Sequence, residues 1–397
     1  MYKTKQRPAR RPSKFTRNSP NRNDSGKKID INKFINKAVS SEDQKIYQPV
    51  NAFANFPLNA DLKQRIEARG YTTPTEIQDK TIPHILAGKD LIGVAGTGTG
   101  KTGAFLIPLI NRLLTNPQYF DSLIITPTRE LALQIEDELK KLTKGTKLTS
   151  TTLIGGTSMN KSLAALSKPN HIVIGTPGRM MDMAQRGKLA FKNFSILVLD
   201  EFDRMLDMGF VKDIERITSQ MAARKQTLLF SATMPASQES IIRKIVRQPV
   251  EVKATTALRS SNSIAQDVIK VSDSEDKFGS LVNLITTEKA EDSRVILFCE
   301  TKRKANKLSR RLTTSGIPSG EIHGNKSQQA REKALKQFKD GHIRVLVATD
   351  VMARGIDVTD VSMVINYEVP RTYDDYIHRI GRTGRAGKTG KAVTFID

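Results

Sequence analysis

A glycine-rich segment that leads into lysine and threonine is the part of the sequence best suited to phosphate chemistry. Its residues are Gly96, Thr97, Gly98, Thr99, Gly100, Lys101 and Thr102. An apolar run at 91–95 precedes it and a helical pattern at 104–114 follows, so backbone N–H groups and a helix N-terminus would face phosphates. Lys101 would then reach the β and γ oxygens of a nucleotide, and the Thr102 hydroxyl would bind Mg²⁺. The strict pattern requires glycine where Ala95 stands, so an ordinary glycine turn is the alternative, which the flanking strand and helix disfavour.

Two acids follow a second apolar run and supply another requirement of nucleotide hydrolysis. The run Ile196–Leu199 leads directly into Asp200 and Glu201. Asp200 is predicted to hold Mg²⁺, and Glu201 to orient or deprotonate the attacking water. A pair of surface acids after a strand is the alternative. The order of the two segments within one stretch of chain favours the catalytic interpretation.

The elements that must position these residues follow an alternating pattern. After residue 46, short apolar runs alternate with amphipathic stretches, which is typical of βαβ units and a parallel sheet. In the first series the expected strands are 91–95, 122–126, 151–154, 172–175, 196–199 and 227–230, with helices at 104–114 and 130–142. In the second series the expected strands are 268–271, 294–298, 345–348, 363–366 and 392–396.

A polar stretch rich in serine and threonine, 254–263, separates the two series and is predicted to be a linker. The pattern therefore predicts an α/β protein with two domains in tandem, at 46–253 and 264–397. The length of 397 residues agrees with this division, because a domain usually takes roughly 100 to 200 residues.

Positive charge is concentrated at the N-terminus. The sequence has 64 Lys and Arg against 41 Asp and Glu, a formal net charge of +23. Residues 1–28 contain ten Lys or Arg, one acid and hardly any large apolar side chain. Such a segment cannot bury enough surface to offset its ordering entropy, so we expect residues 1–45 to form a disordered basic arm. Counterion release favours weak binding of this arm to nucleic acid, and a solubility tail is the alternative.

The remaining composition excludes several classes of protein. A single cysteine, Cys299, excludes an internal disulfide and a metal centre built from several thiolates. No apolar run approaches the ~18 residues that span a bilayer, and no secretion signal is visible. We expect a soluble, cytoplasmic protein that binds a polyanion. Nucleic acid is the usual polyanion, and an acidic membrane surface is the rarer one.

The two phosphate-handling segments belong to a longer series of motifs that occur in a fixed order along the chain. They occupy 70–78, 95–102, 127–132, 155–156, 176–179, 200–203, 231–233, 295–301, 328–331, 348–357 and 378–385. In these motifs the sequence resembles the DEAD-box ATP-dependent RNA helicases of superfamily 2, over nearly everything from Phe53 to Asp397. The resemblance implies two tandem RecA-like domains, ATP and Mg²⁺ as cofactors, and RNA as the partner. No oligomerisation segment is visible in the sequence, so we expect a monomer. The family's phosphate loop commonly begins with alanine, which accounts for Ala95.

The resemblance also implies which residues handle the nucleotide. The residues implied in reading the base and ribose are Phe53, Tyr71, Gln78 and Asp357. An aromatic side chain stacks on adenine, and the glutamine amide offers both a donor and an acceptor to its edge. Arg382 and Arg385 would reach the γ-phosphate from the second domain as arginine fingers. The residues implied in coupling the two domains are Asp203, Ser231, Thr233 and His378.

The implied RNA contacts come from both domains. They are Pro127, Thr128, Arg129, Gly155, Gly156, Thr176, Pro177, Arg179, Gln328, Arg331, Thr349 and Arg354. Small residues let backbone amides approach phosphates, and arginines add charge-assisted hydrogen bonds.

Phe202 is the one clear departure from the family's Asp-Glu-Ala-Asp motif. Both catalytic acids and Asp203 are retained, but a bulky ring needs space against the neighbouring motifs. Hydrolysis is therefore expected, while the coupling between ATP and RNA stays open.

The leading hypothesis is an RNA-stimulated ATPase whose domains close on ATP and RNA and separate a few base pairs locally, without processive tracking. An ATP-gated RNA clamp or annealing chaperone with little unwinding is the alternative. A DNA translocase is a third, against which the segments ending at Gln78 and Asp357 argue. The sequence ends directly after the last expected strand, so a truncated chain and a minimal one both stay open.

Overall fold

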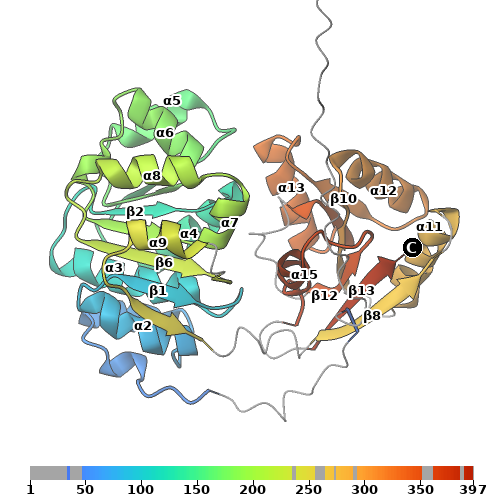
Figure 1. The fold of residues 1–397 in the computed structure, drawn as a ribbon, viewed down its shortest axis with the longest axis horizontal. Helices are drawn as coiled ribbons and strands as arrows, with labels where there is room; N and C mark the ends of the chain where they lie inside the picture. The colour runs from blue at the N-terminus through green and yellow to red at the C-terminus, as the bar shows by residue number, and fades with distance from the viewer. Residues whose placement is uncertain are drawn as a thin grey trace, which may run out of the picture.

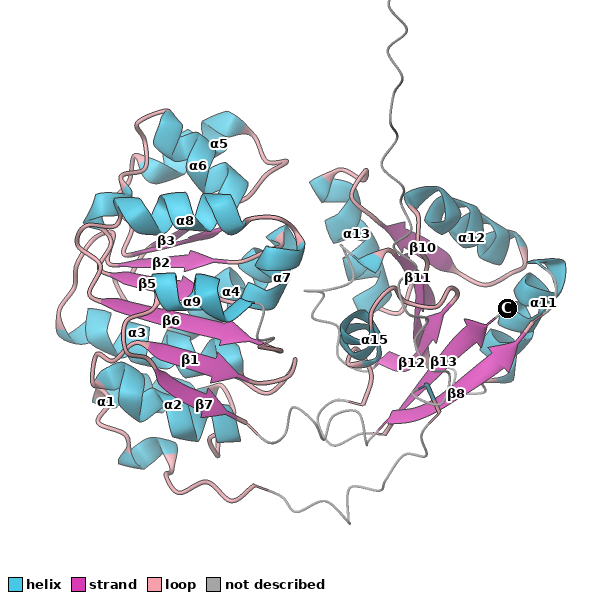
Figure 2. Cartoon of the chain, viewed as in Figure 1, coloured by secondary structure: helices cyan, strands magenta, loops and turns pink. Residues whose placement is uncertain are grey.

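The computed structural model describes residues 34–35, 47–234, 238–254, 264–271, 274–288, 293–350, 361–384 and 389–396 (Figures 1 and 2). The residues 1–28 on which the basic-arm prediction rests, and most of the expected linker, lie outside this range. The boundaries expected for the arm, the two domains and the linker therefore stay predictions.

Among the described residues, the first sheet has seven strands, all parallel, in the order β3-β4-β2-β5-β6-β1-β7. Their bounds are β1 Leu91–Val94, β2 Ser122–Ile125, β3 Ser150–Leu153, β4 Ile172–Gly175, β5 Ile196–Leu199, β6 Gln226–Ser231 and β7 Val250–Lys253. The central strands are apolar on both faces because helices cover both sides of the sheet.

Alternate residues of these strands enter two separate cores. Ile172 and Ile174 belong to one core and Val173, between them, to the other. The helices that supply the first core are α1 (Ala60–Ala68), α2 (Glu76–Leu86), α3 (Lys101–Thr115) and α4 (Arg129–Leu142). Those of the second are α5 (Met159–Leu166), α6 (Pro177–Gln185), α7 (Phe202–Asp207), α8 (Val211–Gln220) and α9 (Glu239–Ile245). Short 3-10 turns lie at η3 (Phe53–Asn55) and η4 (Phe191–Asn193).

The second domain repeats the plan with a parallel sheet of six described strands, in the order β10-β11-β9-β12-β13-β8. The strands are β8 Ile264–Lys270, β9 Arg294–Phe298, β10 Ser319–Ile322, β11 Val345–Ala348, β12 Val361–Asn366 and β13 Gly390–Ile396. Helices α11 (Ser274–Thr287) and α12 (Lys302–Thr314) flank the sheet together with α13 (Gln328–Lys339) and α15 (Tyr373–Ile380). These findings confirm the expected fold class. Within the described residues, no helix combines the length and apolarity needed to cross a bilayer.

The sequence patterns missed two strands, and both lie at a sheet edge. Strand β7 reads Val-Glu-Val-Lys and strand β10 reads Ser-Gly-Glu-Ile, each with only one buried residue. An edge strand can have polar, partly exposed side chains, so it lacks the continuous apolar run that marks a central strand. The centrally placed strands β4, β5, β9 and β11 begin and end where expected.

The motifs of the first domain meet at one edge of its sheet, because the carboxyl ends of parallel strands lie together. Each expected phosphate, acid or RNA motif of this domain follows one of the strands β1 to β6. Figure 2 shows these strands directed toward the second domain. Motifs that are far apart in the sequence therefore lie together at one side of the sheet.

Phe34 is one of the two residues described ahead of Tyr47, and it packs on the second domain. Its side chain is 1% exposed, with its ring centroid 4.7 Å from that of Tyr376. Ile264, Ile380 and Ala392 complete this small apolar cluster. A buried phenylalanine thus lies six residues beyond the basic stretch 1–28, and that stretch has almost no large apolar side chains.

Candidate nucleotide and RNA site

The phosphate loop lies between β1 and α3, as the sequence predicts. Gly98 and Gly100 have φ of 76° and 93°, a left-handed conformation that favours glycine and lets the loop turn into the helix. The Lys101 side chain folds back over the loop, and its Nζ donates to the carbonyls of Ala95 at 2.7 Å and Gly96 at 3.3 Å. Lys101 is 8% exposed, and its ammonium acts on the buried acid Asp200 that follows β5. It is therefore positioned to exchange carbonyl partners for phosphate oxygens.

The two acids after β5 have opposite electrostatic surroundings. Burial raises the pKa of the Asp200 carboxyl to about 7, although the Lys101 ammonium opposes this rise. Burial also acts to raise the pKa of Glu201, but Arg204, Arg382 and Lys101 outweigh it and hold that pKa at about 2. Glu201 is thus ionised at neutral pH and a weak base, which favours orienting a water over deprotonating it.

Arg204 is a buried partner of Glu201 that the sequence reading missed. It lies on α7 three residues beyond Glu201, is 1% exposed, and its Nη1 donates to Glu201 Oε2 at 2.6 Å. Glu201 itself has a φ of 53° at the start of this helix, an uncommon conformation for a residue with a side chain. The ion pair with Arg204 and the backbone turn at Glu201 together fix the position of the Glu201 carboxylate.

The coupling residues are brought together across the domains. Asp203 Oδ2 accepts from the backbone N–H of Thr233 at 3.0 Å and from its hydroxyl at 3.1 Å. The Ser231 hydroxyl accepts from the Asp203 N–H and donates to the Thr233 carbonyl. His378 Nε2 of the second domain lies 3.9 Å from the same Asp203 oxygen. All four predicted coupling residues thus form one contiguous cluster.

Phe202 has its ring in the apolar core and not in the cleft. It is fully buried and belongs to the core cluster that contains Leu199 and Met205. The space that the larger ring requires is therefore provided by the core on this face of the sheet, while Asp200, Glu201 and Asp203 stay grouped.

Arg382 approaches these acids from the second domain. Its Nε donates to the His378 carbonyl at 3.3 Å, it is 3% exposed, and its charge helps to depress the pKa of Glu201. Next to it, the Gly381 carbonyl accepts from the Thr97 hydroxyl of the phosphate loop at 3.4 Å. The loop and α15 therefore touch across the domains.

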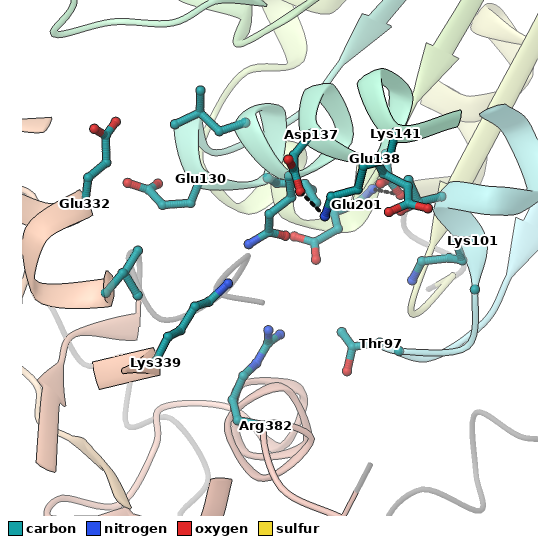
Figure 3. Close-up of a pocket in the computed structure, with 18 of the residues that line it drawn as sticks. Thr97, Lys101, Glu130, Asp137, Glu138, Lys141, Glu201, Glu332, Lys339 and Arg382 are labelled. Carbon is teal, nitrogen blue, oxygen red and sulfur yellow. Dashed lines mark hydrogen bonds and ion pairs between the residues drawn. The ribbon is translucent and has the colours of Figure 1, made fainter. Parts of the chain in front are cut away.

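A cleft of about 700 Å³ opens between the domains at this point (Figure 3). Thr97, Lys101 and Glu201 line it from the first domain, and Lys339 and Arg382 line it from the second. In Figure 3 the Arg382 side chain extends into the cleft toward Glu201 and Lys101. The cleft thus combines cations from both domains with acids of the first, as a triphosphate site requires.

The adenine-reading segment braces the phosphate loop. Gln78 Nε2 donates to the Gly100 carbonyl at 3.0 Å, while its Oε1 accepts from the Thr75 N–H and caps α2. Tyr71 lines the cleft. Phe53 is 5% exposed and contacts Tyr71 edge-on, with ring centroids 5.9 Å apart. Base contacts by these residues stay predictions.

A second hollow, of about 430 Å³, contains most of the RNA residues expected from the first domain. They are Pro127, Thr128, Arg129, Gly155, Thr176 and Arg179, joined by Arg331 and Gly324 of the second domain. We call this hollow the RNA groove. Burial lowers the pKa of Arg129, and the charges of Arg331 and Arg179 lower it further, against the opposing charge of Glu130. Like charges crowded in this way favour an anionic ligand.

Local structure at the groove suits phosphate binding. Thr128 and Thr176 are the N-caps of α4 and α6, so two helix N-termini open toward it. A Cβ on Gly155 would lie 3.0 Å from the Arg129 guanidinium, and one on Gly156 would clash with it. The glycines thus leave the space that Arg129 occupies.

A buried ion pair joins the domains between the cleft and the groove. Glu130 Oε1 and Arg331 Nη1 lie 2.8 Å apart, and the two side chains are 3% and 5% exposed. Gln328 Oε1 also accepts from Arg331 at 3.4 Å, and its amide donates to Glu332. Arg331 therefore has a partner across the domains that the sequence did not indicate, and its RNA contact stays a prediction.

Replacing Glu130 with glutamine is expected to weaken this contact by about 3 to 5 kcal/mol, because it leaves the Arg331 charge buried without compensation. The measurement is RNA affinity with and without a non-hydrolysable ATP analogue, and the ratio between the two should fall. Glu136→Gln is the matched control, since Glu136 lies on the same helix but bonds to Ser150, Thr152 and Lys140 within its own domain. An unchanged ratio in Glu130→Gln would argue against an interdomain role.

Other predicted residues are placed less completely. Thr349 lies just beyond β11, where its N–H donates to the Ile322 carbonyl at 3.4 Å. Arg354, Asp357 and Arg385 lie outside the described residues. Arg379, which the sequence reading passed over, forms a two-pronged ion pair with Asp350 at 2.6 and 2.8 Å and anchors α15. Arg379 lies within the motif 378–385, and this position was the sequence feature that could have indicated its importance.

Two parallel-sheet domains with a phosphate loop, paired acids and an arginine supplied across a cleft define a two-domain nucleotide-dependent enzyme of the helicase type. The family model for the DEAD/DEAH box helicase matches residues 75–241, and the one for the helicase conserved C-terminal domain matches 276–387. The chain belongs to the DEAD-box ATP-dependent RNA helicase family.

Relatives across much of the chain support this membership. The DEAD-box ATP-dependent RNA helicase CshA of Streptococcus pneumoniae is 43% identical over 87% of this chain and 65% of its own length. The ATP-dependent RNA helicase DbpA of Bacillus subtilis is 40% identical over 87% of this chain and 71% of its own. The chain thus spans about two thirds of the curated relatives that it matches. A structure of Mss116p bound to ssRNA and AMP-PNP superposes with a TM-score of 0.80, at 31% identity, over 91% of this chain and 77% of that one.

Proposed function

We propose that this chain hydrolyses ATP in response to RNA and uses closure of its two domains to separate short stretches of RNA duplex, without processive tracking. One observation carries the proposal: Arg382 reaches from the second domain to the acids of the first, so the hydrolytic site is complete only when the domains are together. A finger of this kind contributes about 10³ to 10⁵ in rate by stabilising charge on the transferred phosphoryl group.

In this proposal the residues of the cleft divide the chemistry. Lys101 neutralises the β and γ oxygens, and Glu201, held ionised by Arg204, orients the water for attack. Arg382 stabilises the charge that develops on the γ-phosphate, and Arg385 is proposed as a second finger. The cluster of Asp203, Thr233 and His378 joins the acids to the second domain, so RNA binding and ATP binding favour the same closed arrangement.

Mg²⁺ fits the residues that the cleft presents. Asp200 is 2% exposed, and burial raises its carboxyl pKa, a cost that a bound cation would relieve. Among the described residues no three His, Cys, Asp or Glu side chains gather into a metal cage. Mg²⁺ is commonly held by one or two carboxylates together with substrate phosphates, so Asp200 and Thr102 would suffice on the protein side. Bound there, Mg²⁺ would neutralise phosphate charge.

RNA is the partner that the groove supports. Arg129, Arg179 and the N-termini of α4 and α6 offer donors to a phosphate backbone and little that could read bases. The likeness to Mss116p in complex with ssRNA and AMP-PNP covers both domains and supports a closed arrangement as the RNA-bound one. A cytoplasmic location and a monomeric state also remain proposals.

The test is ATP hydrolysis without nucleic acid, with single-stranded RNA, and with DNA of the same sequence, at two salt concentrations. We expect strong stimulation by RNA and little by DNA. Stimulation by DNA alone would favour a translocase. If RNA binds but turnover stays flat, the ATP-gated clamp becomes the better description, and release of a short labelled strand from a duplex separates these cases further.

A further inference from the structure

Helix α12 carries cations that neither the nucleotide cleft nor the RNA groove uses. Its 13 residues include six Lys or Arg and no acid. Five of these six cations are exposed, and three of the five, Arg303, Lys307 and Arg310, lie in one row along the helix. They are spaced by four and three residues, which places them within about 60° of one another around the helix axis. We call these three residues the α12 stripe.

The α12 stripe points away from the protein. The buried residues of the helix are Ala305, Leu308, Ser309 and Leu312, which lie on the opposite face and pack toward the sheet. Figure 1 shows α12 at the outer side of the second domain, beside β10. The stripe is therefore available to a partner along the whole helix.

The other cations of α12 are already engaged. Lys302 donates to Asn325 at 3.0 Å, and Lys304 pairs with Glu368 at 2.8 Å. The Arg311 guanidinium lies 3.7 Å from the centroid of the Phe278 ring. The side chains of the stripe residues, in contrast, make no hydrogen bond or ion pair with the residues that the structure describes.

Neighbouring acids do not offset the charge of the stripe. Glu300 pairs with Arg371 at 2.9 Å, Glu368 with Lys304, and Glu321 accepts from Ser309 at 2.6 Å as well as pairing with Lys326. Each of these three carboxylates is thus matched by a cation outside the stripe, whose three positive charges face solvent in a row.

The stripe begins beside a residue that lines the RNA groove. Lys302, in the first turn of α12, bonds to Asn325, and the adjacent Gly324 lines the groove. At a rise of 1.5 Å per residue, Arg303 and Arg310 lie about 10 Å apart along the axis, which suits two or three successive phosphates of a strand. RNA that leaves the groove at Gly324 would meet the stripe next.

We propose that the α12 stripe is an accessory RNA-binding surface that holds the phosphates of a strand extending beyond the groove. The inference rests on RNA binding in the proposed function. A protein partner fits less well, because interfaces usually bury an apolar centre and none of the exposed large apolar residues that the structure describes lies on α12. Binding through phosphates alone would add affinity and salt dependence without sequence preference.

The test compares oligouridylates of about 6 and about 20 nucleotides, one confined to the groove and one extending past it. The variant combines Arg303→Gln, Lys307→Gln and Arg310→Gln in the full chain. Its affinity for the long RNA should fall about tenfold at low salt, and the slope of log affinity against log salt should flatten by about 2, since each phosphate contact contributes about 0.7. Affinity for the short RNA should change less than twofold. Replacing Lys307 and Arg310 with glutamate should enlarge the loss.

The matched control removes three charges elsewhere with Lys188→Gln, Lys192→Gln and Lys225→Gln. These lysines are exposed. They precede β5 and β6 in the chain, whereas the motifs of the first domain follow its strands. Equal losses in the variant and the control would assign the effect to net charge and overturn the inference. So would a long-RNA affinity and salt slope that do not change in the variant. If the unaltered chain bound neither RNA, the proposed function itself would fail.

Discussion

Replacing Lys101 with alanine is expected to reduce ATP turnover by about 10³-fold or more, since removing even a single uncharged donor from a transition state commonly costs 10² to 10³. Lys101 is 8% exposed, and its Nζ lies 2.7 Å from the Ala95 carbonyl, where the phosphate loop enters α3. Its removal leaves the charge on the β and γ oxygens without the cation that the phosphate loop itself supplies. The measurement is steady-state phosphate release at saturating RNA.

The same substitution should also change the charge state of a neighbour. The Lys101 ammonium lowers the pKa of the Asp200 carboxyl, which burial raises to about 7. Without the lysine that opposing charge is lost, so the metal-free Asp200 carboxyl becomes harder to ionise. Lys141→Ala is the control, because Lys141 lines the same cleft but pairs with Asp137 (Figure 3). Near-normal turnover in Lys101→Ala would refute the assignment of this loop.

Replacing Arg382 with alanine is expected to lower the rate of hydrolysis by about 10³ to 10⁵, with ATP binding largely retained. The reason is positional: Arg382 comes from the second domain, whereas the phosphate loop and both acids belong to the first. Its charge acts on the γ-phosphate only in the closed arrangement, so it stabilises the transition state more than the bound ground state. Single-turnover hydrolysis and equilibrium binding of a fluorescent ATP analogue separate the two effects.

The Arg382 experiment has a built-in comparison. Lys339 lines the same cleft from the same domain, but it lies on α13, and Arg382, not Lys339, is among the main charges that lower the pKa of Glu201 (Figure 3). Lys339→Ala should therefore change hydrolysis by less than tenfold. If Arg382→Ala weakened nucleotide binding as much as it slowed hydrolysis, the residue would be a binding contact and not a finger.

The position of the Phe202 ring bears on whether ATP and RNA binding are coupled in this protein. The sequence raised the question of whether a ring in place of alanine would crowd the motifs beside it. The ring enters the core with Leu199 and Met205, and the hydrogen bonds of Asp203 to Thr233 are present. The geometry therefore supports intact coupling, which the RNA-stimulation measurement tests directly.

The sequence by itself determined the central strands, the phosphate loop and the placement of the acids. Strands β4, β5, β9 and β11 are buried on both faces, so each is a continuous apolar run that can be read without knowing its neighbours. The phosphate loop is equally local, because strand, glycines, lysine and helix are consecutive in the chain. The edge strands β7 and β10 were not predicted, because they are partly exposed and therefore lack a continuous apolar run.

Only the tertiary structure decided which charges meet. Glu130 and Arg331 are 201 residues apart and carry no local mark of their pairing. The contacts of Asp203 with His378, and of Thr97 with Gly381, likewise depend on how one domain rests on the other. The ionised state of Glu201 follows from the same packing, since the charges of Arg204 and Arg382 outweigh the cost of burial. Residue type and spacing specify each half of the site, but the pairing of charges across a cleft depends on distances that the chain acquires only on folding.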